Sequence, residues 1–149
     1  MNLQWTITPF DSLGVQALHG ILKLRVDVFV VEQHCPYAEV DGLDPLAHHV
    51  QGHDANGTLV AYARLLPPDA HGLPHIGRVV VHPDHRGRGL ARTLMEHSIR
   101  AVEQAHGSRR NAVSAQAHLV PFYSSLGYVA TSPAYDWDGI PHVDMVLNG

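Results

Sequence analysis

The stretch VVVHPDHRGRGLARTLM, residues 79–95, joins a run of valines to a segment with helical periodicity through glycines and arginines. The apolar run from Ile76 to Val81 ends before Pro83 and predicts a strand buried on both faces. Apolar residues then recur at helical spacing from Leu90 to Ala105, and Gly107 is a typical C-terminal stop. The stretch therefore predicts a strand, a tight loop and a helix.

The loop of this unit has the chemistry of a phosphate site. The first N–H groups of a helix have no intrahelical acceptors and carry the positive end of the helix dipole. Gly87 and Gly89 let the backbone approach an anion, while Arg86, Arg88 and Arg92 add positive charge. A lone glycine pair is more often a simple turn, but glycines, arginines, strand and helix coincide here. The spacing fits neither a nucleotide P-loop nor the full dinucleotide-binding pattern.

The other elements follow from periodicity and from turn residues. They are a strand at Leu3, Trp5 and Ile7, a helix from Ser12 as N-cap to Glu32, strands 47–52 and 58–66 around the Asn56-Gly57 turn, a strand 112–117, a helix 119–126 closed by Gly127, and strands 128–131 and 142–147. This order predicts an α/β fold with a central, mixed and mostly antiparallel sheet flanked by helices.

Composition limits the class of protein. The 149 residues, 45% of them apolar, predict a single domain spanning 1–149, with no apolar run long enough for a membrane span. The net charge of -4 disfavours a nucleic-acid partner, and we expect a cytoplasmic protein. Cys35 is the one cysteine, so a disulfide could form only between chains, which leaves a homodimer open.

Two motifs resemble those of the GCN5-related N-acetyltransferase (GNAT) family. Arg86-x-x-Gly89-x-Ala91 matches the family signature Q/R-x-x-G-x-G/A, and residues 121–128, PFYSSLGY, are similar to its FYxxLGF-type segment. Residues 28–44, 115–128 and 138–145 together resemble the ElaA-type branch, a group of small bacterial acyltransferases.

The resemblance implies acetyl-CoA as the acetyl donor and direct attack by an amine in a ternary complex. It implies that the backbone of Val79, Val80 and Val81 pairs with the pantetheine arm. It places the pyrophosphate on a set of amides near Arg86, those of Gly87, Arg88, Gly89, Leu90, Ala91 and Arg92. Gln116 stands where many members have a cofactor-contacting asparagine. Tyr123 matches the tyrosine that protonates the departing thiolate, and a phenol is a reasonable acid for that task.

The acceptor side is expected in residues 28–44, which family members commonly use as the substrate wall. Its predicted acceptor contacts are Glu32, Cys35, Glu39 and Asp41. The carboxylates of this segment, those of Glu32, Glu39, Asp41 and Asp44, suit a cationic amine. An ammonium must lose a proton before attack, and Glu32 is the leading candidate base, with Glu39, His82 or a water chain as alternatives. The acceptor is expected to be an amine-bearing small molecule or peptide.

Four other functions are alternatives to acetyl transfer. A zinc site could combine Cys35 with histidines from His34, His48, His49, His82 and His85, but no metal-binding spacing is present, and we predict no metal. Thiol catalysis would need a base beside Cys35. A third alternative is a non-catalytic module that binds CoA or another phosphate ligand. The fourth is nucleic-acid binding, which the negative net charge disfavours; it would use Arg86, Arg88, Arg92, Arg109 and Arg110.

Overall fold

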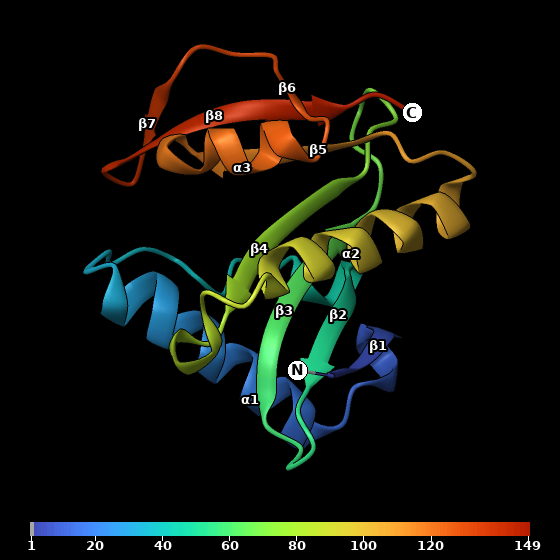
Figure 1. The fold of residues 1–149 in the computed structure, drawn as a ribbon, viewed down its shortest axis with the longest axis vertical. Helices are drawn as coiled ribbons and strands as arrows, with labels where there is room; N and C mark the ends of the chain where they lie inside the picture. Colours follow the sequence, from blue (N-terminus) through green and yellow to red (C-terminus); the bar gives the residue numbers. More distant parts are fainter. Residues whose placement is uncertain (1) are drawn as a thin grey trace.

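The computed structural model describes residues 2–149, which form a twisted eight-stranded sheet with helices on both faces (Figure 1). The strands are β1 (Gln4–Pro9), β2 (His48–His53), β3 (Leu59–Leu66), β4 (His75–Val81), β5 (Asn111–Gln116), β6 (Val129–Ala130), β7 (Tyr135–Trp137) and β8 (Ile140–Leu147). The longer helices are α1 (Val15–Arg25), α2 (Leu90–His106) and α3 (Val120–Ser125). Short helical segments are η1 (Phe10–Ser12), η2 (Val26–Glu32), η3 (Asp44–Leu46), η4 (Pro83–His85) and η5 (Ala117–Leu119).

The sheet order is β1-β2-β3-β4-β5-β8-β6, with β7 paired to β8. All of these pairs are antiparallel except β4–β5, which is parallel. The predicted mixed, mostly antiparallel sheet flanked by helices is therefore confirmed. No helix among residues 2–149 combines the length and apolar character needed to cross a membrane.

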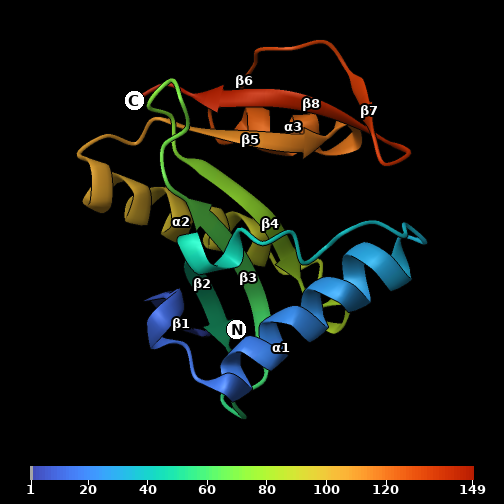
Figure 2. The ribbon, with the colours of Figure 1, turned by 180° about the vertical axis from the view of Figure 1, so that it is seen from behind.

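Two apolar cores lie on opposite faces of the sheet. The larger packs α2 and α3 against the sheet and includes Leu94, Val113 and Tyr123. The smaller packs α1 against Tyr62 and Val80, and Figures 1 and 2 show α1 and α2 on opposite sides. Successive side chains of a strand point to opposite faces, so Val79 and Val81 belong to the α2 side while Val80 faces α1.

Strands β4 and β5 separate soon after they meet. Their register contains the single pair His75 and Ala112, beyond which the strands diverge (Figure 1). The prediction that the valine strand is buried on both faces is therefore wrong in part: Val80 is 4% exposed, but Val79 and Val81 are only half-buried. The edge of β4 that should meet β5 instead borders an opening.

A bulge in β4 marks the start of this opening. Tyr62 pairs with Val80 and Arg64 with Gly77, so Arg78 and Val79 together oppose one residue of β3. Arg78 has a φ of 50°, in the left-handed region. A bulge of this kind turns the strand and re-aims side chains, here that of Arg78. Nothing in the valine-rich sequence signals it.

The first helix differs from its prediction at both ends. Ser12 is not its N-cap: it closes the turn η1, and α1 begins after Gly14 in extended conformation. At the other end the helix widens into η2, where Gln33 N–H donates to Val28 O and Cys35 N–H to Val30 O. These bonds span five residues, a π-type turn that often marks a functional segment.

The glycine stops were predicted correctly, and one strand was missed. Gly107 ends α2 with a φ of 75°, and Gly57 closes the β2–β3 hairpin at 79°. Strand β7 was overlooked, although Asp138-Gly139, with φ of 52° and 81°, is a typical two-residue hairpin turn between β7 and β8.

Candidate active site

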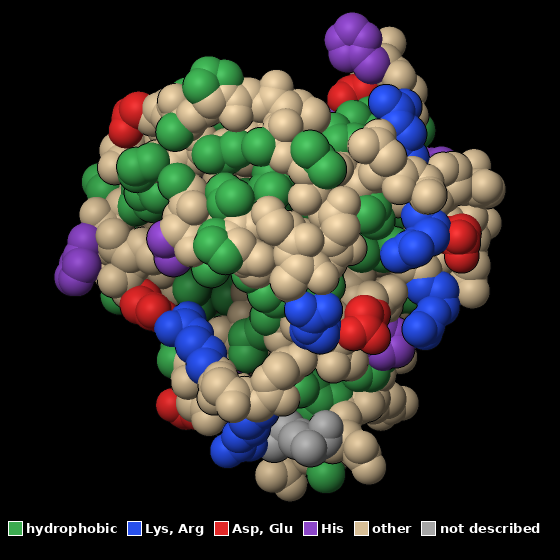
Figure 3. Space-filling model, turned by 45° about the horizontal axis from the view of Figure 1, so that its top comes forward, with side chains coloured by type: hydrophobic (Ala, Val, Ile, Leu, Met, Phe, Trp, Pro, Cys, Tyr) green, Lys and Arg blue, Asp and Glu red, His purple; other side chains and the backbone are tan. Residues whose placement is uncertain are grey.

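A cavity of about 770 Å³ opens where β4 and β5 diverge, and residues from both faces of the sheet line it. The predicted residues that it brings together are Glu32, Cys35, Val79, Val80, Val81, Arg86, Gly87, Gly89, Leu90, Ala91, Arg92, Gln116 and Tyr123. Four predicted residues are not in its lining: Arg88, Glu39, Asp41 and the alternative base His82. In the space-filling view, basic side chains lie beside a hollow lined by hydrophobic groups (Figure 3).

The glycine loop at one end of the cavity has room for a ligand phosphate. Gly87 and Gly89 have φ of 79° and 72°, which side-chain-bearing residues rarely adopt. A Cβ on either glycine would meet no atom within 4 Å, so it would occupy the open space beside the loop. Thr93 N–H makes the bond to Gly89 O, so the amides of the helix positions before it have no helical acceptor. These features fit a bound pyrophosphate.

The free edge of β4 supplies the second fit. Val79 and Val81 lie along the cavity after the last β4–β5 pair, where no neighbouring strand covers this edge. An extended ligand with amide groups can bond such an edge as an added strand would. The cavity therefore offers a backbone edge for a pantetheine arm and a helix start for its phosphates.

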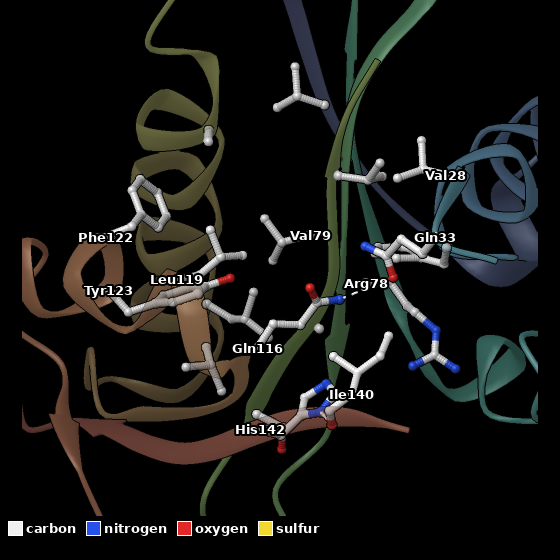
Figure 4. A pocket seen from close by; sticks show the side chains of 18 of the residues that line it. Val28, Gln33, Arg78, Val79, Gln116, Leu119, Phe122, Tyr123, Ile140 and His142 are labelled. Carbon is white, nitrogen blue, oxygen red and sulfur yellow. Dashed lines mark hydrogen bonds between the residues drawn. The ribbon is translucent and has the colours of Figure 1, made fainter. Parts of the chain in front are cut away.

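Tyr123 points into this cavity from the α2 and α3 side (Figure 4). The side chain is 6% exposed, and burial raises the pKa of its hydroxyl to about 12. Its ring packs edge-on against those of Phe122 and Tyr128. The hydroxyl is therefore protonated at neutral pH and can donate a hydrogen bond or a proton, although the raised pKa makes it a weaker acid than an exposed phenol.

Glu32 lies at the cavity but is already paired. Its two carboxylate oxygens accept from Arg86 Nη1 and Nη2 at 2.7 and 2.9 Å. The hydrogen bond from Arg86 lowers the pKa of Glu32. A carboxylate with a lowered pKa is a weaker base, and this pair also fastens the end of η2 to the phosphate loop. The arrangement favours a positioning role for Glu32.

Glu39 lies in a buried ionic cluster behind the cavity wall. Its Oε2 accepts from Arg25 Nε at 2.6 Å and from Arg78 Nε at 2.8 Å, and its Oε1 accepts from the Tyr37 hydroxyl. Glu39 is 3% exposed and Arg25 fully buried. Buried charges in proteins need partners of this kind. The geometry favours a structural role for Glu39 over contact with an acceptor.

Asp41 and Asp44 belong to the same ionic cluster. Asp41 accepts from Arg64 Nη1 and Nη2 at 2.9 Å each, and Asp44 accepts from Arg25 at 2.7 Å. Partial burial opposes ionisation of Asp41, but hydrogen bonds from Arg64 and from Leu43 N–H lower its pKa to about 2. Of this network, Arg64, Arg78 and Tyr37 border the cavity, and the carboxylates stand behind them.

The sequence did not reveal part of the cavity wall, which is formed by residues after η2, by β4 and by the β7–β8 hairpin. Gln33 Oε1 accepts from Gln116 Nε2 at 3.2 Å, joining that wall to β5 (Figure 4). The missed residues include Gln33, Tyr37, Arg78, Trp137, Ile140 and His142. The turn signal Asp138-Gly139 could have placed Trp137, Ile140 and His142 together on a hairpin, but nothing in the sequence placed that hairpin beside η2.

Cys35 and His49, which were candidates for a metal or thiol site, are instead hydrogen-bonded within the fold. Cys35 is buried, and its Sγ donates to Asp138 O at 3.3 Å, which ties the loop after η2 to the β7–β8 turn. His49 is fully buried between the Tyr62 hydroxyl at 2.7 Å and Asp44 O at 3.1 Å. Within residues 2–149, no group of three or more His, Cys, Asp or Glu side chains is arranged so that it could hold a metal ion.

The comparisons with known proteins agree with this geometry. Residues 24–148 match the acetyltransferase (GNAT) domain family. A UPF0039 protein of Schizosaccharomyces pombe is 46% identical over 147 residues, covering 98% of this chain and 97% of its own. The crystal structure of an acyl-CoA N-acyltransferase from Pseudomonas aeruginosa has a TM-score of 0.92 at 43% identity and covers 97% of this chain and 99% of that one. Escherichia coli ElaA has a TM-score of 0.91 at 36% identity, with the same coverage.

Proposed function

Because the chain belongs to the GNAT acetyltransferase family, we propose that it transfers the acetyl group of acetyl-CoA to an amine by direct attack in a ternary complex. The observation that carries the proposal is the cavity between β4 and β5, which joins an anion-binding loop, a free strand edge and a buried phenol. The family membership of the chain and its similarity to ElaA support acyl transfer. That the transferred group is acetyl and that the acceptor is an amine are our inferences.

Binding of the donor follows the fit of the cavity. The backbone of β4 from Val79 to Val81 would pair with the pantetheine arm, and the amides from Gly87 to Arg92 would hold the pyrophosphate. Glu32 would keep Arg86 extended along the loop through its two-point contact. Gln116, tied to Gln33, would hold the two walls at the reacting end of the cavity.

The residues then have distinct chemical tasks. Bound acetyl-CoA supplies a thioester carbonyl that an amine nitrogen can attack. Tyr123 is the proposed acid: its hydroxyl is protonated at neutral pH and would donate that proton to the departing thiolate. A base must accept a proton from the incoming ammonium, since only a neutral nitrogen has a lone pair for attack. We propose that Glu32 positions Arg86 and does not accept this proton.

The acceptor would enter from the side of α1, where Tyr37, Arg78 and Cys35 line the cavity. The proposed acceptor is an amine-bearing small molecule or a peptide end. Location in the cytoplasm and a homodimer stay predictions from the sequence alone.

Calorimetric titration with acetyl-CoA, followed by thiol release over a panel of amines, tests the proposal. We expect a dissociation constant in the micromolar range and thiol release with at least one amine. Absence of acetyl-CoA binding contradicts the central claim. Binding without turnover of any amine favours the alternative function, a non-catalytic CoA-binding module.

A further inference from the structure

Strand β8 places a histidine, His142, in the wall of the cavity. His142 is half-buried in the cavity wall, opposite Gln116 in the β5–β8 register. Its ring packs beside those of Tyr135 and Trp137, at centroid distances of 6.2 and 5.1 Å. The side chain is therefore held by β7 on one side and faces the cavity on the other (Figure 4).

The hydrogen bond of the ring fixes where its proton sits. His142 Nδ1 lies 2.7 Å from the carbonyl oxygen of Ile140. A carbonyl oxygen only accepts, so Nδ1 must carry the hydrogen in the neutral ring. Nε2 is then the unprotonated nitrogen, and its lone pair is free for a proton from outside. A backbone acceptor that orients an imidazole in this way is a common arrangement for a catalytic base.

The bases expected from the sequence lack this arrangement. His82 Nδ1 accepts from Asp84 N–H at 3.1 Å, which puts the proton on Nε2, and His82 does not line the cavity. Glu32 is held by Arg86 with a lowered pKa. His75, which lines the cavity but was not among those candidates, has its Nε2 2.8 Å from an Asp69 carboxylate oxygen.

His142 and Tyr123 also reach the cavity from opposite faces of the sheet. Tyr123 belongs to the core on the α2 side. His142 pairs with Gln116, whose side chain bonds Gln33 on the α1 side. The opening between β4 and β5 connects the two faces, so one group can act on the leaving sulfur while the other meets the incoming nitrogen.

We propose that His142 is the general base of the acetyl transfer, an inference that rests on the proposed function. Nε2 takes one proton from the ammonium, whose nitrogen then forms the C–N bond as the C–S electron pair moves to sulfur. Tyr123 gives its proton to that sulfur and regains one from the new amide nitrogen. The products are the N-acetyl amine, the CoA thiol and one proton, which His142 passes to solvent.

The first test is nitrogen NMR of the histidine rings in the free protein at pH 7.5. We expect His142 to show a protonated Nδ1 and a bare Nε2, with its signals assigned by their loss in His142→Asn. His82 should show the opposite tautomer and so serves as the internal reference. A neutral His142 ring protonated at Nε2 overturns the proposal whether or not an acceptor is known.

The second test is kinetic and uses the intact protein. His142→Asn can still donate to Ile140 O but has no basic nitrogen. We expect its kcat for an alkylamine at pH 7 to fall ~100-fold or more, with acetyl-CoA affinity within about twofold of wild type. The defect should shrink to about tenfold or less with an aniline-type amine, which is already neutral. His71→Asn, an exposed loop residue outside the cavity, is the control.

The possible outcomes distinguish a failure of the base assignment from a failure of the proposed acetyltransferase function. Wild-type protein that binds acetyl-CoA but acetylates no amine overturns both. An active wild type with a fully active His142→Asn overturns only the base assignment. An equal loss with both classes of amine assigns His142 to acceptor binding and also overturns it.

Discussion

At the scale of single residues, Tyr123 is the side chain whose chemistry can be tested most directly. Its hydroxyl points into the cavity, and burial raises its pKa to about 12. Tyr123→Phe should lower kcat at least ~100-fold because the thiolate loses its proton donor. Acetyl-CoA affinity and the free energy of unfolding should stay close to wild type, since the ring is kept. Thiol-release kinetics, calorimetry and urea titration measure the three quantities.

The neighbouring Tyr128 gives the matched control. Its hydroxyl donates to Asn111 Oδ1 at 2.7 Å in the buried core. Tyr128→Phe leaves that acceptor unpaired and should cost about 1–3 kcal/mol of stability, with kcat little changed. A Tyr123→Phe enzyme with normal kcat would mean that the phenol is a packing group and not the acid.

The roles of individual residues were only partly accessible from the sequence. Tyr123 could be assigned because it sits in a recognisable segment, PFYSSLGY. Glu39 was expected to face the acceptor, yet Arg25 and Arg78 surround it from positions 14 and 39 residues away. His142 was not singled out, because its significance depends on a bond to Ile140 O that only the folded hairpin creates.

At the scale of elements, the two ends of α2 allow a paired experiment. Gly89 and Gly107 have φ of 72° and 75°, and a Cβ at either would meet nothing within 4 Å. Replacing either glycine by alanine should therefore cost a similar ~1–2 kcal/mol of stability, the strain of a left-handed residue. Only Gly89→Ala should weaken acetyl-CoA binding, by tenfold or more, because its methyl group would enter the phosphate niche.

Calorimetry of both variants, together with their urea unfolding curves, measures this difference. Equal acetyl-CoA affinity in the Gly89 and Gly107 variants would place the phosphates somewhere other than this loop.

Elements with strong periodicity were predictable, and irregular ones were not. Helix α2 and strand β3 could be predicted from apolar residues and from glycine stops, because α2 buries one face and β3 is buried on both. The π-type turn of η2 and the bulge at Arg78 arise from tertiary packing around the cavity. Neither leaves a pattern in the order of residues, and both shape the acceptor wall.

At the scale of the whole molecule, buried histidine makes stability depend on pH. Burial lowers the pKa of His49 below its ordinary value of 6.5. Its Nε2 donates to Asp44 O, so its Nδ1 accepts from the Tyr62 hydroxyl in the neutral form. Below pH ~6.5 the unfolded chain takes up a proton that the folded protein resists, so this contribution to stability is complete above that pH and is lost as pH falls.

The free energy of unfolding, measured in urea, should therefore decrease between pH 7.5 and pH 5.5. His49→Gln should be less stable than wild type at pH 7.5 by about 1–3 kcal/mol and should show a weaker pH dependence. His71→Asn, in an exposed loop, should retain the wild-type slope. The same slope in His49→Gln as in wild type would mean that other histidines control the effect.

The meeting of β4 and β5 at one residue pair also has a mechanical meaning. The two parts of the sheet, β1 to β4 and β5 to β8, share a single register pair, His75 with Ala112, and are joined by the larger core. A ligand bound between β4 and β5 would contact both parts, so we expect its binding to make the whole sheet more rigid. Slower hydrogen exchange in β5 and β8 would then report that the cavity is occupied.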